Sequence, residues 1–316
     1  MRIFLNGEPV KTEQTKDITI QESVNFLDNF DFTLDEIQIT LPLDYYFRIK
    51  KITINRVVIK KDENNTILFI GYAYKPVLNY KGQTFQLTCT SIFSDIIKET
   101  TVNTTETYNA VDLLYSLISP FLINPFVCKN FSNAKTAVNA NVIFDTDGND
   151  VSVGEAVKSI LELLQVGLYV SGTEIKLLAF PTIWPETAEP VGNDLTNGKL
   201  SDISQLSEYY YDKVALTYAT GVGVDTATVE SGTGDLVKSV SLGTSIYCTA
   251  TDAQVLCDRI YNVVHRKYWQ TSSMQTNIKN NLDVGKFIEL EDFIFLIKGK
   301  TIEGSNINYN LIGVEK

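Results

Sequence analysis

The stretch "TILFIGYAYKPVLNYKGQTFQLTC" (Thr66–Cys89) and the stretch "FIFLIKGKTIEGSNINYNLIGV" (Phe293–Val314) share one layout. In each, an apolar strand ends near a glycine (Gly71 or Gly299), and a second strand, a polar turn and a third strand follow. Alternating residues between turn signals are typical of β-meanders. The shared layout predicts a duplicated β-unit, and a chance likeness of two hairpins is the alternative.

The chain around these stretches divides into three regions by its periodicity. Residues 1–95 and 201–316 are dominated by period-2 alternation, which predicts two β-domains. Residues 96–200 change to a helical period and then to a short hairpin, which predicts a small α+β domain. The predicted fold class is therefore mainly β with an α+β insert, that is, two β-domains and one small α+β domain.

Local signals predict where elements begin and end. An Asn6-Gly7 pair predicts a tight turn, and the Gly- and Thr-rich stretch 222–242 predicts a hairpin. Thr251, with Gln254 three residues later, predicts the start of a helix over about 251–268. The proline- and glycine-rich stretch 180–198 predicts a linker. The residues predicted to share one face of each of two further helices are Val111, Leu114, Tyr115 and Ile118, and Val157, Ile160, Leu161 and Leu164.

The composition restricts the class of protein. The chain has 316 residues, 44% of them hydrophobic, and its mean hydropathy is -0.01, as expected of a soluble globular protein. A formal net charge of -11 disfavours binding to a phosphate backbone, and the basic stretch Arg48–Lys61 is predicted to be a strand with a solvated face. Four cysteines without a C-x-x-C pair predict buried free thiols. Neither a signal peptide nor a membrane span is predicted, so we expect synthesis in the cytoplasm.

Acidic residues gather in "FDTDGNDVSVGEAVKSILELL", where two interpretations compete. A calcium loop counted from Asp145 would need Gly at its sixth position and Glu at its twelfth, but Asp150 and Ala156 stand there. The spacing of Ser152 and Glu155 instead predicts a capping box that starts a helix. The acidic residues before it then form a solvated turn, and we expect no metal site.

Candidate catalytic groups are few. His265 is the only histidine, and Cys257 lies about 12 Å from it along one helix, too far for a direct contact. No pair stands out among 38 acidic residues, and the "IELEDF" cluster (Glu289, Glu291 and Asp292) is predicted to face solvent. Two glycine-rich stretches, "TGVGV" and "SGTGD", lack the following helix of a phosphate site and are predicted to be loop tips. The sequence predicts no catalytic, cofactor-binding or metal-binding residue and no enzyme.

Aromatic residues are plentiful, with 16 Tyr, 16 Phe and 2 Trp. The stretches "LDYYFRI" (Leu43–Ile49) and "EYYYDKV" (Glu208–Val214) are compatible with subunit contacts or with stacking on sugars, and most such aromatics in β-rich proteins lie in cores or interfaces. A carbohydrate-binding or carbohydrate-cleaving protein is therefore the alternative function.

The order of the elements resembles the hub proteins at the tip of phage tails. The resemblance rests on "FTLDEIQITLPL", "KITINRVVIKK" and the first meander, then on "YNAVDLLYSLISPFLINPFV", on the acidic turn with its helix and hairpin, and on the final β-unit. It covers most of the chain and rests on layout, without a diagnostic motif. The group includes baseplate hubs of contractile phages, the N-terminal part of siphophage tail-tip proteins and spike-base proteins of related injection systems.

This resemblance implies an architecture. Members of the group carry two tail-tube-like β-barrels, here residues 1–95 and 201–316, and a smaller α+β domain, here 96–200. Three copies then present six barrels, and the trimeric ring joins a six-fold tail tube to a three-fold tip or spike and forms part of the DNA channel.

The resemblance also implies partners and a location. It implies a virion protein of the phage tail, made in the host cytoplasm, that forms a homotrimer without catalytic residues. Its expected partners are the tail tube or distal tail protein and spike, tape-measure or tail-fibre proteins. DNA is expected only as passing cargo, and no stable membrane association is expected. Because the chain ends soon after the second barrel, any spike, lytic or receptor-binding module is expected to be a separate protein.

Overall fold

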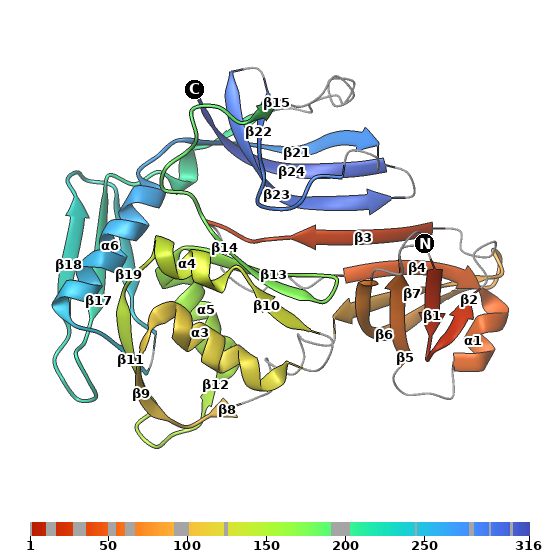
Figure 1. Ribbon diagram of the computed structural model, residues 1–316, viewed down its shortest axis with the longest axis horizontal. Helices are drawn as coiled ribbons and strands as arrows, with labels where there is room; N and C mark the ends of the chain where they lie inside the picture. Colours follow the sequence, from red (N-terminus) through yellow and green to blue (C-terminus); the bar gives the residue numbers. More distant parts are fainter. Residues whose placement is uncertain are drawn as a thin grey trace.

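The computed structural model describes residues 2–10, 17–27, 36–49, 55–60, 67–91, 101–122, 126–190, 203–243, 245–277, 281–290, 292–303 and 306–316 (Figure 1). The strands are β1 (Arg2–Leu5), β2 (Glu8–Val10), β3 (Asp17–Ser23), β4 (Glu36–Pro42), β5 (Asn55–Lys60), β6 (Ile67–Asn79), β7 (Thr84–Ser91), β8 (Thr101–Val102), β9 (Thr105–Asn109), β10 (Val127–Lys129), β11 (Asn141–Asp145), β12 (Val151–Ser152), β13 (Val166–Ser171), β14 (Glu174–Ala179), β15 (Glu189–Pro190), β16 (Ser204–Leu206), β17 (Lys213–Tyr218), β18 (Ala227–Gly232), β19 (Val237–Ser241), β20 (Ile246–Tyr247), β21 (Tyr268–Asn277), β22 (Phe287–Leu290), β23 (Phe293–Glu303) and β24 (Asn306–Glu315). The α-helices are α1 (Leu43–Ile49), α3 (Ala110–Ile118), α4 (Phe131–Ala137), α5 (Val153–Leu164) and α6 (Ala250–Val264), and the short 3-10 helices are η2 (Ser119–Phe121) and η3 (Ser207–Tyr209).

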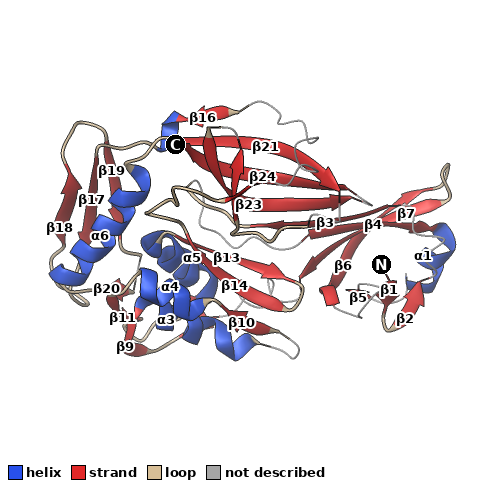
Figure 2. Cartoon of the chain, turned by 45° about the horizontal axis from the view of Figure 1, so that its top comes forward, coloured by secondary structure: helices blue, strands red, loops and turns tan. Residues whose placement is uncertain are grey.

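One sheet contains strands from both ends of the chain. Among the described residues it has 13 strands in the order β16-β21-β24-β23-β3-β4-β7-β6-β5-β1-β2, with β22 beside β23 and β15 beside β22. Strand β3 pairs with β4 on one side and with β23, over Gly299–Glu303, on the other. The two terminal regions are therefore neighbours in a single sheet (Figures 1 and 2).

The mainly β fold with an α+β insert is confirmed. In the described part of the chain the strand order of the large sheet does not return to its start, so the two closed barrels stay a prediction. The domain limits also stay a prediction. No helix among the described residues is long and apolar enough to cross a membrane.

Each of the two stretches is one long antiparallel hairpin, β6–β7 or β23–β24, and the preceding strand, β5 or β22, pairs with the first strand of the hairpin, which confirms the two meanders. The prediction that a strand ends near Gly71 or Gly299 was wrong, because β6 and β23 continue through these residues. A Cβ on Gly71 would lie 2.1 Å from the carbonyl oxygen of Thr90 in the neighbouring strand, so this glycine allows close strand contact inside the sheet. In both hairpins the first strand carries a register shift.

The N-terminal strands follow the predicted pattern where they are described. Asn6 and Gly7 both have positive φ (51° and 89°), as the predicted tight turn between β1 and β2 requires. In β5, Val57 and Ile59 are buried and Arg56 is exposed, which confirms a strand with one solvated face. The rest of the basic stretch belongs to α1 or falls on 50–54 and 61, outside the described residues.

The α+β region packs its helices on the sheet β10-β14-β13. Helix α5 lies on β13 and α4 on β14, and α3 contacts both helices. The predicted face of α5 is buried, as are three of the four residues predicted for α3. Tyr115 is the exception: it is 47% exposed, and its ring contacts Phe131 of α4 edge-on. The part of the predicted linker over 180–188 has no helix or strand, but Phe180 and Trp184 are buried, and 191–198 lies outside the described residues, so the linker stays a prediction.

A second, smaller sheet lies beside the α+β region (Figure 1). Its order is β18-β17-β19, and helix α6 packs on β17 and β18. The hairpin predicted over 222–242 is therefore wrong: β18 and β19 do not pair with each other, because β17 lies between them and is parallel to β19. Strand β20 pairs with β11, which joins the segment after residue 201 to the α+β region.

Helix α6 begins before the predicted position. Its N-cap is Thr249, whose hydroxyl accepts from the backbone N–H of Asp252 at 3.1 Å, and the helix ends at Val264. The prediction of Thr251 with Gln254 was wrong. The Asp252 carboxylate also accepts from the backbone N–H of Asn141 in β11 (2.8 Å), so a tertiary contact selects the earlier of two overlapping capping patterns.

Candidate functional site

The acidic stretch before α5 is a turn closed by its own hydrogen bonds. Asp145 accepts from the backbone N–H of Asp147 (3.0 Å) and from Thr105 Oγ1 (2.8 Å), and these bonds lower the pKa of its carboxyl group. Ser152 Oγ accepts from the backbone N–H of Glu155 at 3.4 Å, which confirms the predicted N-cap. In the part of the chain that the structure describes, no group of three or more His, Cys, Asp or Glu side chains is arranged to hold a metal ion.

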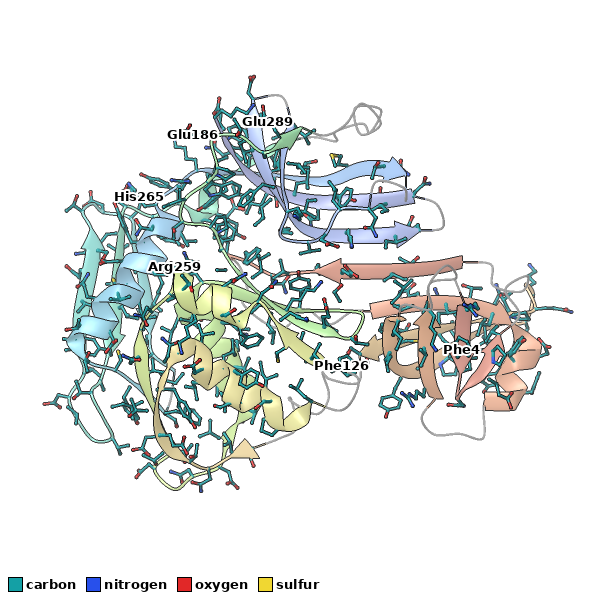
Figure 3. All side chains as sticks on the ribbon, viewed as in Figure 1. Phe4, Phe126, Glu186, Arg259, His265 and Glu289 are labelled. Carbon is teal, nitrogen blue, oxygen red and sulfur yellow. The ribbon has the colours of Figure 1, made fainter. Side chains whose placement is uncertain are left out.

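His265 and Cys257 have different partners, as their spacing predicts. The exposed His265 ring stacks on Tyr261 with ring centroids 4.7 Å apart, and its Nδ1 lies 2.9 Å from the carbonyl oxygen of Tyr211 (Figure 3). The Cys257 thiol is buried and donates to the carbonyl oxygen of Val214 at 3.5 Å. Burial raises its pKa, which disfavours the thiolate that a nucleophile needs.

The two aromatic stretches do not form one surface. Leu43–Ile49 is helix α1, in which the Tyr46 ring packs against Phe85, whereas η3 and β17 lie at the opposite end of the molecule (Figure 1). There, Tyr211 lies under the ammonium group of Lys238 at 5.7 Å. Most aromatic side chains of these two stretches therefore make contacts within the chain.

Of the three acidic residues predicted to face solvent, Asp292 is exposed and Glu291 lies outside the described residues. Glu289 is partly buried, so that prediction was wrong for it. It accepts from Lys316 Nζ and from the backbone N–H of Ala188, and these interactions lower its carboxyl pKa. The glycine-rich stretch 220–224 lies in the turn between β17 and β18, whereas 231–235 includes the end of β18 and the turn after it.

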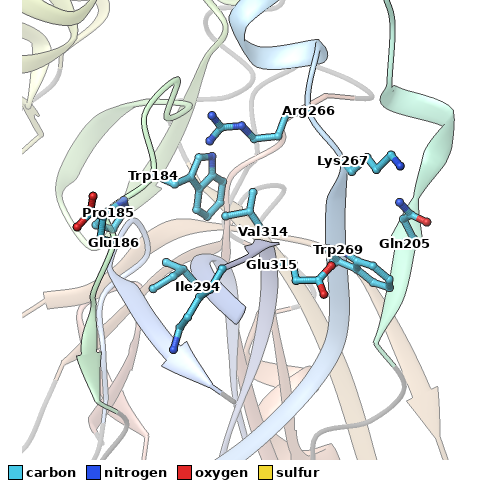
Figure 4. A pocket seen from close by; sticks show the side chains of 11 residues that line it. Trp184, Pro185, Glu186, Gln205, Arg266, Lys267, Trp269, Ile294, Val314 and Glu315 are labelled. Carbon is cyan, nitrogen blue, oxygen red and sulfur yellow. The ribbon is translucent and has the colours of Figure 1, made fainter. Parts of the chain in front are cut away.

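A groove of about 850 Å³ lies near the C-terminal end of the large sheet (Figure 4). It is lined from the segment before β15, from β16, from the start of β21, from the start of β23 and from the end of β24. Trp184 is fixed by edge-on contact with Phe287 (centroids 5.5 Å apart), and Trp269 by contact with Phe293 (5.5 Å). No sequence pattern indicates this groove, because its lining comes from segments that only the tertiary fold brings together.

The three regions of the chain meet at a buried ion pair. Lys300 of β23, 5% exposed, places its Nζ 3.1 Å from Glu22 Oε2 of β3. Glu22 Oε1 accepts from Ser171 Oγ of β13 at 3.2 Å, and Lys300 Nζ also donates to Asn281 Oδ1 (3.0 Å). This cluster therefore connects the N-terminal strands, the α+β region and the C-terminal strands.

A buried arginine makes a second connection between regions. Arg259 of α6 donates from Nε to the Leu164 carbonyl oxygen (3.2 Å) and from Nη2 to the Gln165 carbonyl oxygen (3.3 Å) at the end of α5 (Figure 3). It also donates to the carbonyl oxygen of Phe180. Burial lowers the pKa of Arg259 to about 10, and the negative end of the α5 dipole favours the charged form.

Three solved structures have this arrangement over nearly the whole chain. A tail protein from Neisseria meningitidis has a TM-score of 0.61 and 10% sequence identity, and the alignment covers 98% of this chain and 95% of that one. The tail protein of prophage MuSo2 from Shewanella oneidensis has a TM-score of 0.58 at 10% identity, with 98% and 97% covered. Prophage tail protein gp18 from Listeria monocytogenes has a TM-score of 0.53 at 9% identity, with 95% of each chain covered.

The chain therefore has the fold of phage tail proteins, and the resemblance inferred from its sequence is confirmed at the level of the fold. No protein-family model matches the chain, and no curated protein matches it in sequence.

Proposed function

We propose that this protein is a structural hub at the distal end of a phage tail, without enzymatic activity. In this proposal three copies form a ring that joins the six-fold tail tube to a three-fold tip or spike and surrounds part of the DNA channel. The observation that carries the proposal is the alignment with phage and prophage tail proteins, which covers nearly all of this chain and nearly all of each of them.

The internal connections between the three regions support a structural role. The β3–β23 pairing, the Glu22–Lys300 cluster and the Arg259 cluster join the three regions through buried groups. Such contacts oppose independent movement of the regions, as a ring subunit between two partners requires. The formal net charge of -11 is compatible with the channel function, because a channel lined by acidic residues would repel DNA that passes through it.

Exposed strand edges support assembly with other subunits. Among the described residues, β16 and β2 are terminal strands of the large sheet, and a terminal strand leaves backbone N–H and C=O groups available for pairing. Closing these edges between copies would complete the tube-like barrels. The tail tube or distal tail protein and spike, tape-measure or tail-fibre proteins would then be the partners, and the virion the location.

The oligomeric state tests this proposal. Light scattering on the purified chain is expected to give three times the protomer mass of 35.4 kDa, and electron microscopy is expected to show a ring with a central channel. Monomers at every accessible concentration, or a compact oligomer without a channel, would contradict it. A matched assay for release of reducing sugar ends from host cell-wall polysaccharide tests the rival carbohydrate-cleaving function, for which the hub proposal expects no activity.

A further inference from the structure

The proposed hub function assigns no role to the groove that Trp184 and Trp269 line. We propose that it is a binding site for a short neutral oligosaccharide. This inference goes beyond the proposed function and does not depend on the ring. The volume of the groove, about 850 Å³, falls within the range of about 300–1,000 Å³ that small-ligand sites occupy.

The two indoles supply apolar surfaces that are already held in place. Trp269 is partly exposed and is fixed on one side by the Phe293 ring, while Trp184 is 8% exposed and is packed against Phe287 and Tyr268. The C–H face of a pyranose ring is apolar and packs on an aromatic surface. Because both rings already pack against neighbouring aromatic rings, we expect a ligand that stacks on Trp269 to cost the protein little side-chain entropy.

The polar lining suits hydroxyl groups better than it suits an ion. The positive and negative side chains in and beside the groove are equal in number. The cations are Arg266, Lys267 and Lys316, and the carboxylates are Glu186, Glu315 and Glu289. Such a balance gives little attraction for a polyphosphate or for a strongly charged peptide. Carboxylates accept, guanidinium and ammonium groups donate, and the exposed Gln205 amide does both, so that hydroxyl groups find partners of each kind.

Tryptophan fluorescence provides a direct test, because both tryptophans of the chain line this groove. The full chain is titrated with a panel of short neutral oligosaccharides built from hexoses, deoxyhexoses and N-acetylhexosamines, and calorimetry then follows those that change the emission. We expect saturable binding of at least one class. Trp269→Ala should weaken that binding about tenfold or more, which corresponds to about 1.4 kcal/mol, because it removes the stacking surface.

Two further variants separate loss of the site from loss of the fold. Gln205→Ala, at an exposed rim position, should weaken binding without lowering the melting temperature. Tyr80→Ala removes an aromatic ring that is 68% exposed and outside the groove, and it should bind as the wild type does.

Three outcomes would overturn the carbohydrate site. The first is the absence of saturable binding across the panel, and the second is wild-type affinity in Trp269→Ala. The third is protection of the partly exposed Trp269 from acrylamide in the assembled protein, which would mean that another subunit or a peptide covers the groove. None of these outcomes changes the subunit count measured by light scattering, so failure here and failure of the hub proposal are distinguishable.

Discussion

At the residue scale, the start of α5 depends on one hydroxyl group. Ser152→Ala removes the acceptor for the Glu155 backbone N–H, and we expect the free energy of unfolding to fall by about 1 kcal/mol in denaturant titration. Ser132→Ala, at an exposed position inside α4, is the control and should change it by less than about 0.5 kcal/mol. Equal effects of the two substitutions would contradict the assigned N-cap.

Buried thiols predict a loss of stability in alkali. Burial raises the pKa of Cys248 from its ordinary value of 9.0 to about 12. Between these values the folded state holds a proton that the unfolded state has released, so the contribution of Cys248 is complete below pH 9 and is lost as the pH rises toward 12. Unfolding midpoints measured under reducing conditions between about pH 8 and 10.5 should fall less steeply in Cys248→Ala than in the wild type. Parallel curves would contradict this role of Cys248.

At the element scale, Arg259 joins α6 to the end of α5. Arg259→Met leaves three buried carbonyl oxygens without this donor, and we expect the free energy of unfolding to fall by about 3 kcal/mol. Arg259→Lys keeps the charge but loses the planar fork, so its effect should be intermediate. Lys129→Met, at an exposed position of β10, is the control and should stay within about 0.5 kcal/mol of the wild type. An Arg259→Met protein as stable as this control would refute the connection.

At the scale of the whole molecule, the Glu22–Lys300 pair and its hydrogen-bond partner Ser171 connect all three regions of the chain. Glu22→Gln leaves the Lys300 ammonium group buried with weaker partners, and the free energy of unfolding should fall by about 3 kcal/mol. The double substitution Glu22→Leu with Lys300→Met should recover much of this loss, because it removes both charges together.

An exposed ion pair gives the matched control for this measurement. Lys213 and Glu230 lie 2.7 Å apart, but Glu230 is 53% exposed, so Glu230→Gln should cost less than about 1 kcal/mol. If Glu22→Gln costs no more than Glu230→Gln in the same denaturant titration, the buried cluster does not hold the three regions together.

The sequence by itself determined the local structure. The turn at Asn6-Gly7, the N-cap at Ser152 and the buried face of α5 depend on residues only a few positions apart, and local backbone preference and periodicity decide them. The mainly β character with an α+β insert followed from the same periodicities. These periodicities could not show whether Gly71 ends a strand or lies within one, because the position of Gly71 in the sheet depends on the neighbouring Thr90 backbone.

Only the tertiary structure decided how distant segments pair. Strand β3 lies against β23, and β17 lies between β18 and β19, because pairing depends on which faces become buried together. The same applies to the Thr249 cap, which Asn141 supports from another strand, and to the groove that Trp184 and Trp269 share. A sequence pattern records the preference of each segment for strand or helix, whereas the free energy of contact between segments depends on which surfaces meet, and no single segment contains that information.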